Sequence, residues 1–242
     1  MAVKNFLSNI GKVACGVGMA LASVAMVPAH GADLDVRIVN LTNGIYYTPF
    51  LVAAHDDSTR LFVSGQPASA SLQAMAEGGD ISGLVADLTA VGATIVENPA
   101  AGLLAPTESV TTNLNTDGTD NIRLSVVAML LPTNDAFMGL GAIVIPTEPG
   151  TYVYNVPAYD AGTEANDEIV NGGGAPGVPG IPAAPGGSGS GGSGAAGADT
   201  NTTVHIHRNT IGDTDPVGGV SDLDATVHRW LNPVARVIVT VN

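Results

Sequence analysis

The chain has 242 residues, 45% of them hydrophobic, which is enough for one domain with a large core. Its formal net charge is −14 at pH 7, with 22 acidic residues against eight basic ones. A surface of this sign repels nucleic acid and anionic lipid headgroups, so we expect neither as a partner, and it attracts cations.

The start of the chain has the pattern of a secretory signal peptide. Lys4 and Lys12 precede an apolar run over 13–27 that is too short to span a membrane comfortably. Small residues then offer three cleavage points, after Ala29, Gly31 or Ala32. We therefore expect residues 1–31 to be removed, leaving a secreted or periplasmic protein of residues 32–242 without a membrane anchor.

Removal of residues 1–31 takes away both lysines and the only cysteine, Cys15. The rest of the chain then has six arginines against 22 acidic residues, a formal charge of −16. General solubility explains most of these acids. An exported protein without a disulfide has to be stabilised by apolar burial, or by a bound metal.

The first elements expected in the mature chain are strands. Residues 34–40 alternate between apolar and polar side chains, and 45–55 form a second extended run. Residues 67–91 differ, because they lack the β-branched side chains typical of strands. Gly78-Gly79 ends a helix there and Asp80 is a good N-cap for another, so we expect two short inserted helices that pack over an open end of the sheets.

The remainder of the chain predicts a mainly β fold. The run over 123–131 is nearly unbroken in its apolar character, as in a central strand buried on both faces. Further strands are expected over 110–115, 143–145, 152–156, 202–208 and 233–241.

A long segment rich in glycine, proline and serine spans residues 171–198. Such a composition has almost nothing to bury, so it predicts a flexible loop without a packed core. We interpret it as a loop on one domain, because the residues that follow end in two strong strands that need partners.

Two acidic turns flank the strand pair over 143–156. The first is Pro132-Thr133-Asn134-Asp135, and the second, starting at Tyr159, carries Asp160 and Glu164. If both turns lie at one end of the sheets, the three carboxylates converge and repel one another unless a cation lies between them. Calcium is the natural partner for such oxygen ligands, although acidic turns without a metal are common in β proteins.

Four histidines give an alternative metal hypothesis. His205 and His207 lie on one face of an expected strand, because side chains alternate along a strand. Two imidazoles at this spacing can hold zinc or copper, with a third ligand from His55 or His228. The competing interpretation is a polar face that forms hydrogen bonds across strands.

A second acidic set spans 212–215 and 221–224, but it lacks the spacing of an EF-hand loop. Turn chemistry is its expected role, with a weak second cation site as the alternative. The chain has no G-x-S-x-G motif, no phosphate-binding glycine loop ending in lysine and no cysteine nucleophile after residue 31. We therefore do not expect an enzyme.

The two acidic turns also carry a resemblance. P-x-x-D-x-F-x-G over 132–139 and Y-D-A-G-T-E over 159–164, with LVAAHDDSTRLF, RLSVVAMLL and WLNPVARVIVTV in other parts of the chain, are similar to the spondin N-terminal domain family in its bacterial version. The resemblance implies a secreted, C2-like antiparallel β-sandwich with a calcium ion held by loop carboxylates.

By position, the resemblance makes Asp135, Asp160 and Glu164 the calcium ligands. Glu164 stands where animal members of the family are expected to have aspartate, which gives a longer arm for the same role. The cysteines of the animal domains are absent, for example from 139–142, so disulfide-dependent features of the family do not transfer.

Together these observations predict a secreted calcium-binding module that binds an extracellular protein or polysaccharide, as in adhesion. One alternative is a subunit of an extracellular fibre or matrix, with self-association through the glycine-rich loop or exposed strand edges. Another is a periplasmic zinc- or copper-binding protein that uses His205 and His207.

The signal-peptide hypothesis predicts that the exported protein starts between His30 and Asp33. N-terminal sequencing or the intact mass of the exported protein measures this directly. A mature chain that retains Cys15 would show that residues 1–31 are not a cleaved signal.

Overall fold

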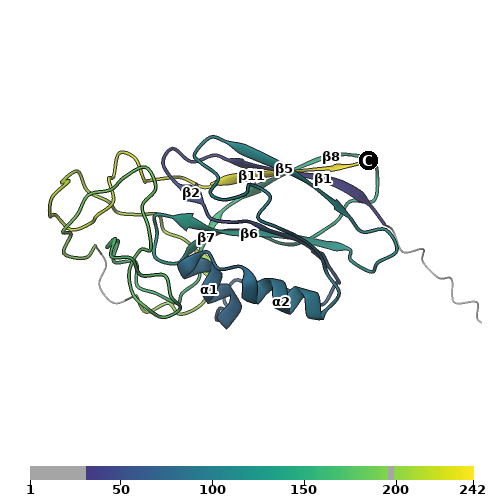
Figure 1. The fold of residues 1–242 in the computed structure, drawn as a ribbon, viewed down its shortest axis with the longest axis horizontal. Coiled ribbons are helices and arrows are strands. Elements are labelled where there is room, and N and C mark those ends of the chain that lie inside the picture. The colour runs from purple at the N-terminus through teal and green to yellow at the C-terminus, as the bar shows by residue number, and fades with distance from the viewer. Residues whose placement is uncertain (1–30, 196–198) are drawn as a thin grey trace, which may run out of the picture.

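The computed structural model describes residues 31–195 and 199–242, so the predicted signal peptide lies outside the described residues except for Gly31. The described chain forms three layers: a four-stranded antiparallel sheet, a larger antiparallel sheet and two helices on the outer face of the larger sheet (Figure 1). This arrangement confirms the predicted mainly β sandwich with two inserted helices. Within these ranges no helix is long and apolar enough to cross a bilayer.

The four-stranded sheet has the order β5-β1-β11-β8. Its strands are β1 (Asp33–Asn40), β5 (Ser109–Asn115), β8 (Gly150–Val156) and β11 (Ala235–Val241). Leu34, Val36 and Ile38 are fully buried, while the polar residues between them are at least partly exposed. The alternation seen in the sequence therefore places one face of this sheet on the core and leaves the other in solvent.

The larger sheet has the order β10-β9-β7-β6-β3-β4, and β2 also pairs with β6. Its strands are β2 (Tyr46–Tyr47), β3 (Leu51–His55), β4 (Thr94–Glu97), β6 (Arg123–Leu131), β7 (Ala136–Val144), β9 (Ala158–Asp160) and β10 (His205–Ile206). Every residue of β6 after Arg123 is buried, as predicted for a central strand.

The two helices are α1 (Ala70–Gly78) and α2 (Ser82–Ala90). Ser69 caps α1 by accepting a hydrogen bond from the Leu72 N–H, and Gly79 ends it in the left-handed conformation. Asp80 is not the N-cap of α2, which is Ile81, but its Oδ1 accepts from the Ser82 N–H at 2.9 Å.

The position of the helices corrects the prediction that they pack over an open end of the sheets. They cover the face of the larger sheet instead (Figure 1). The reason is that β3 and β6 carry apolar side chains on both faces, so the outer face must also be removed from water. This second core contains Leu72, Met75, Leu84 and Leu88 of the helices with Leu51, Val127, Met129 and Phe137 of the sheet.

Strand β7 begins earlier than the strand expected over 143–145. The added part contains Gly139 and Gly141, which the sequence pattern does not favour in a strand. Both leave room for the ring of Phe62: a Cβ on Gly139 would lie 2.6 Å from Phe62 Cζ, and one on Gly141 would lie 3.1 Å from it. Phe62 also contacts the rings of Phe137 and Tyr159, with centroid distances of 5.1 and 4.9 Å. The ring is therefore held in place over the strand that leads away from the first acidic turn.

This packing predicts that Gly139→Ala lowers the free energy of unfolding by about 1–3 kcal/mol, because the added methyl group overlaps a ring that its neighbours confine. Gly141→Ala has more clearance and serves as the matched control, with a smaller loss expected. Urea unfolding of both variants provides the comparison. Equal stability of wild type and Gly139→Ala would mean that the Phe62 ring moves aside freely.

Candidate metal centre at the acidic loop end

The pairing of β7 with β9 brings the two acidic turns together. Ala136 pairs with Asp160, so Asp135 at the start of β7 lies beside the turn that begins at Asp160. The Asp135 carbonyl accepts a hydrogen bond from the Ala161 N–H at 3.2 Å. The loops after β9 form the end of the molecule at which β6 finishes (Figure 1). The expectation that both turns lie at one end of the sandwich therefore holds for Asp135 and Asp160.

Asp135 is fully buried, and its two carboxylate oxygens have different surroundings. Oδ2 accepts hydrogen bonds from the Thr163 N–H at 2.9 Å, the Glu164 N–H at 3.2 Å and the Thr163 hydroxyl at 3.3 Å. Oδ1 is buried and has no hydrogen-bond partner among the described residues. A buried oxygen of this kind is costly unless a proton or a cation satisfies it.

Glu164 shows the same asymmetry. Its Oε1 accepts hydrogen bonds from the Asn134 side-chain amide at 3.0 Å and from the Gly180 N–H. Its Oε2 is buried without a hydrogen-bond partner in the described chain. Each acidic turn therefore supplies one carboxylate oxygen that the described residues leave unsatisfied.

Asp160, in contrast, uses both of its oxygens within the described residues. Oδ1 accepts from the Gly162 N–H and Oδ2 from the Asn166 side-chain amide, each at 2.8 Å. The Nε2 atoms of His205 and His207 lie farther away, each 3.8 Å from Asp160 Oδ2. Asp160 is thus a buried acceptor at the junction between the carboxylates and the histidines.

The pKa values of two of these carboxyl groups are raised, first by burial and then by neighbouring negative charges. Burial, followed by the charge of Asp160, raises the pKa of Asp135 to about 7, although the Thr163 and Glu164 N–H groups oppose this shift. Burial also raises the pKa of Glu164; hydrogen bonds from Gly180 and Asn134 oppose the shift, and the charges of Glu77 and Asp167 add to it. A divalent cation would remove this repulsion.

Two further acidic residues, which the sequence pattern did not identify as part of the site, lie near it. Glu77 of α1 is fully buried, and its Oε2 accepts from the Gly177 N–H at 2.6 Å. Asp167 shares the Asn134 side-chain amide with Glu164, at 2.8 Å. Only the three-dimensional fold brings Glu77 to the site. Helix α1 is far from the acidic turns in the sequence, and its helix pattern gives no reason to place a carboxylate there.

The donor chemistry of the site fits calcium, but side chains alone do not complete it. Asp135 and Glu164 offer two buried carboxylate oxygens that the described residues leave unsatisfied, and calcium takes six to eight oxygen ligands in flexible geometry. Within residues 31–195 and 199–242, no three or more His, Cys, Asp or Glu side chains are grouped so as to hold a metal ion. Backbone carbonyls or water would have to supply the remaining ligands.

The histidines are brought together only in part. His207 accepts from the Asn209 N–H at Nδ1 and lies 3.0 Å from Asn166 Oδ1 at Nε2, so its hydrogen bonds assign a neutral, Nε2-protonated ring. Burial lowers the pKa of His207 to about 4, which agrees with this state. Both ring nitrogens are therefore occupied, and no lone pair is left for a metal.

The other histidines have separate surroundings. His205 Nδ1 donates a hydrogen bond to the Thr203 carbonyl at 2.8 Å. The lone pair of His205 is therefore on Nε2, on the other side of the ring. His55 contacts Asp56 and Ser125, while His228 accepts from the Asp224 N–H. Neither of the last two joins His205 and His207 in a group of ligands within the described residues.

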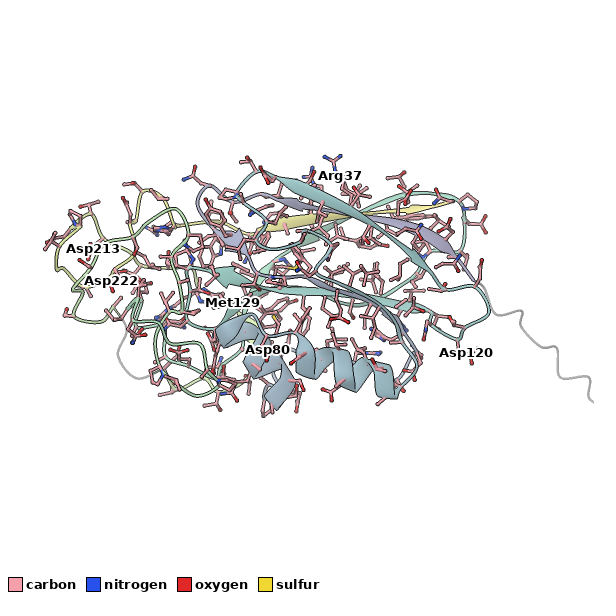
Figure 2. The ribbon with its side chains drawn as sticks, in the orientation of Figure 1. Arg37, Asp80, Asp120, Met129, Asp213 and Asp222 are labelled. Carbon is pink, nitrogen blue, oxygen red and sulfur yellow. The ribbon has the colours of Figure 1, made fainter. Side chains whose placement is uncertain are left out.

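The second acidic set is used as backbone acceptors. Asp213 accepts N–H bonds from Asp215, Val220 and Ser221, which lower its pKa. Asp222 accepts from the N–H groups of Val170 and Gly192. Figure 2 shows Asp213 and Asp222 among the loops at this end of the molecule. A hollow of about 360 Å³ lies between them, but the turn interpretation accounts for these hydrogen bonds without a metal.

The glycine-rich segment packs more than its composition predicts. Ile181 is fully buried and forms a bridge with Val170. The N–H groups of Gly177, Gly180 and Gly192 donate to carboxylates of three different acids. The segment buries little, as expected, since only Gly180 and Ile181 are buried within 171–195, but acceptors elsewhere in the chain hold its backbone N–H groups.

The comparison with known protein families matches the part of the chain that contains both acidic turns. A sequence model of the Spondin_N family matches residues 40–168, from the end of β1 through both acidic turns. The chain belongs to the Spondin_N family, which is an extracellular type of domain. A search of curated proteins finds no match. The family match includes Asp135, Asp160 and Glu164 but not His205 or His207.

The raised pKa of Asp135 predicts a pH effect in metal-free protein. Its folded-state pKa lies above its ordinary value of 3.8, so its contribution to stability is complete below pH 3.8 and is lost as the pH rises through about 7. Asp135→Asn should therefore gain stability relative to wild type as the pH rises from about 5 to 8, by at most about 1.4 kcal/mol per pH unit.

Chemical unfolding in EDTA over this pH range measures the effect. Asp120→Asn is the matched control, because Asp120 is exposed and lies at the opposite end of the molecule (Figure 2). A constant difference between wild type and Asp135→Asn at all pH values would contradict the predicted protonation of Asp135.

Proposed function

We propose that this chain is an exported binding module whose ligand-facing loops are held in place by one calcium ion at the acidic loop end. The observation that carries the proposal is the pair of buried, unsatisfied oxygens, Asp135 Oδ1 and Glu164 Oε2. They come from two separate turns and lie where the carboxylates repel one another. Bound calcium would supply the positive charge that both oxygens need.

The residues around the ion would act as a clamp. Asp135 already binds the backbone of the turn at Thr163 and Glu164 through its other oxygen. Glu164 binds the backbone of the glycine-rich segment at Gly180. An ion that joins the free oxygens of Asp135 and Glu164 would therefore connect the sheet, the turn after β9 and the glycine-rich segment.

Asp160 would complete the negative field of the site. Its two oxygens accept from Gly162 and Asn166, but a carboxylate oxygen has more than one lone pair and can also bind a cation. Its charge acts on Asp135 directly. The proposed ligand set is Asp135, Asp160 and Glu164. Because these three side chains do not form a ready metal-binding group among the described residues, Asp160 would have to turn an oxygen toward the ion, and carbonyl or water oxygens would fill the remaining positions.

The proposed activity is binding or adhesion outside the cell. Membership of an extracellular family supports this class, and the loop end offers the surface that the ion would fix. The ligand in this proposal is an extracellular protein or polysaccharide. A zinc or copper centre is less favoured, because His207 has both ring nitrogens in hydrogen bonds.

The proposal predicts that millimolar calcium raises the melting temperature of the exported protein and that magnesium raises it less, because magnesium demands stricter geometry. A ligand that binds only the folded state stabilises it by about 2.7 kcal/mol at a hundredfold excess over Kd. Asp160→Asn should remove most of the calcium effect, and Asp120→Asn should retain it. Thermal unfolding with EDTA and with added calcium measures all three proteins.

Elemental analysis of the purified protein complements the melting curves. Calcium that copurifies with wild type and not with Asp160→Asn would support the site. Identical melting temperatures in EDTA and in calcium, together with no copurified calcium, would mean that the acidic turns are only turns.

A further inference from the structure

The outer edge of β8 has no partner strand among the described residues. β8 is the last strand in the order β5-β1-β11-β8, and all seven of its residues pair with β11 without a bulge. The one additional backbone hydrogen bond of β8 in the described chain is accepted by the Val156 carbonyl from the Val234 N–H. The backbone groups that point away from β11 are therefore available to another strand.

The sequence of β8 has none of the features that usually protect such an edge. It reads Gly-Thr-Tyr-Val-Tyr-Asn-Val, without a charged residue or a proline. Natural edge strands are commonly guarded by lysine, proline or a bulge. The nearest carboxylates in the sequence, Glu148 and Asp160, lie outside the strand on both sides. In a chain of charge −14, this edge is a place where two copies can meet without bringing like charges together.

We propose that β8 pairs with β8 of a second copy, antiparallel and about a two-fold axis beside Val153, so that the two four-stranded sheets become one eight-stranded sheet. An antiparallel pair of identical strands is self-complementary under two-fold symmetry. Val153 then lies opposite Val153 of the second copy, Tyr152 opposite Tyr154, and Thr151 opposite Asn155.

The side chains of β8 suit this register on both faces of the sheet. Tyr152 and Tyr154 are half-buried against the core between the sheets, so the pairing would place aromatic side chains opposite one another. On the solvent face Val153 is 57% exposed and is paired with Ile238 of β11. The register therefore continues an apolar row of Ile238 and Val153 across the axis. Aromatic and β-branched cross-strand pairs are the ones that stabilise sheets.

The other long edge of this sheet, β5, is less suited to the role. Its exposed side chains are serine, threonine and asparagine, and Arg37 of β1 reaches over the strand to the Ser109 hydroxyl at 3.1 Å. Figure 2 shows Arg37 on this solvent face. Glu108 immediately precedes the strand. A head-to-tail contact of β8 with β5 of the next copy would form an open filament rather than a closed dimer.

The proposal is independent of the calcium site, because β8 belongs to the sheet that does not carry Asp135 or Asp160. Association should therefore be equally strong in EDTA and in calcium. It should strengthen with ionic strength, because salt screens the repulsion between two acidic chains.

Analytical ultracentrifugation over a range of protein concentrations tests the proposal. Wild type should show a monomer–dimer equilibrium. Val153→Lys should weaken it by at least about tenfold, because two lysines would face each other across the axis. Thr111→Lys on β5 is the matched control, since it adds the same charge to an exposed position of the other edge, and its dimer should be unchanged.

A second variant keeps the test decisive if Val153→Lys folds poorly. In the exported protein, which has no cysteine after residue 31, Val153→Cys should form a disulfide-linked dimer on mild oxidation and Thr111→Cys should not. The proposal is overturned if wild type stays monomeric at every concentration or if Val153→Lys dimerises as wild type does. Assemblies larger than a dimer that Thr111→Lys also disrupts would instead indicate the head-to-tail contact.

Discussion

The structure depends on buried and half-buried carboxylates that accept hydrogen bonds from backbone N–H groups. Between β9 and β11 the described residues have almost no regular secondary structure, apart from the two residues of β10. Its buried backbone donors still need acceptors. Glu168 supplies them for Ile211 and Gly212, and Asp222 for Val170 and Gly192. The acidic composition thus has a structural role, since carboxylates hold a glycine-rich region that offers little apolar surface.

At the proposed cation site the described residues supply fewer hydrogen-bond donors than the carboxylate oxygens need. Most of the acids at this end have neutral donors for their oxygens, whereas Asp135 and Glu164 each have one buried oxygen left over. Burial raises the pKa of both groups, and neighbouring carboxylates raise it further: Asp160 and Glu164 act on Asp135, and Glu77 and Asp167 act on Glu164. Below about pH 7 a proton can satisfy Asp135, and above that pH the proposed cation would take the place of the proton. Calcium and protons would therefore compete for this end of the molecule, while the β8 edge in the opposite sheet responds to neither.

Local pattern predicted the strands with clear periodicity, such as β1, β6 and β11, because alternation and unbroken apolar runs report burial directly. The two acidic turns meet, but not through the strand pair predicted between them: β7 and β8 belong to different sheets, and the turns are joined by the pairing of β7 with β9. Glu77 could not be predicted, since its role arises from contact with Gly177 across the fold. The packing of residues 171–195 was missed for a related reason: composition shows what a segment can bury, but not which distant carboxylates accept its N–H groups.

The most direct test of the central claim is isothermal titration of calcium into EDTA-stripped exported protein, in buffers of different ionisation enthalpy. The account predicts one calcium per chain. Binding should release about one proton at pH 6, where Asp135 is protonated, and almost none at pH 8.5, because the pKa of Asp135 is raised to about 7. Asp135→Asn should abolish the proton release and weaken binding. Absence of binding, or binding that is the same in wild type and Asp135→Asn, would contradict the account.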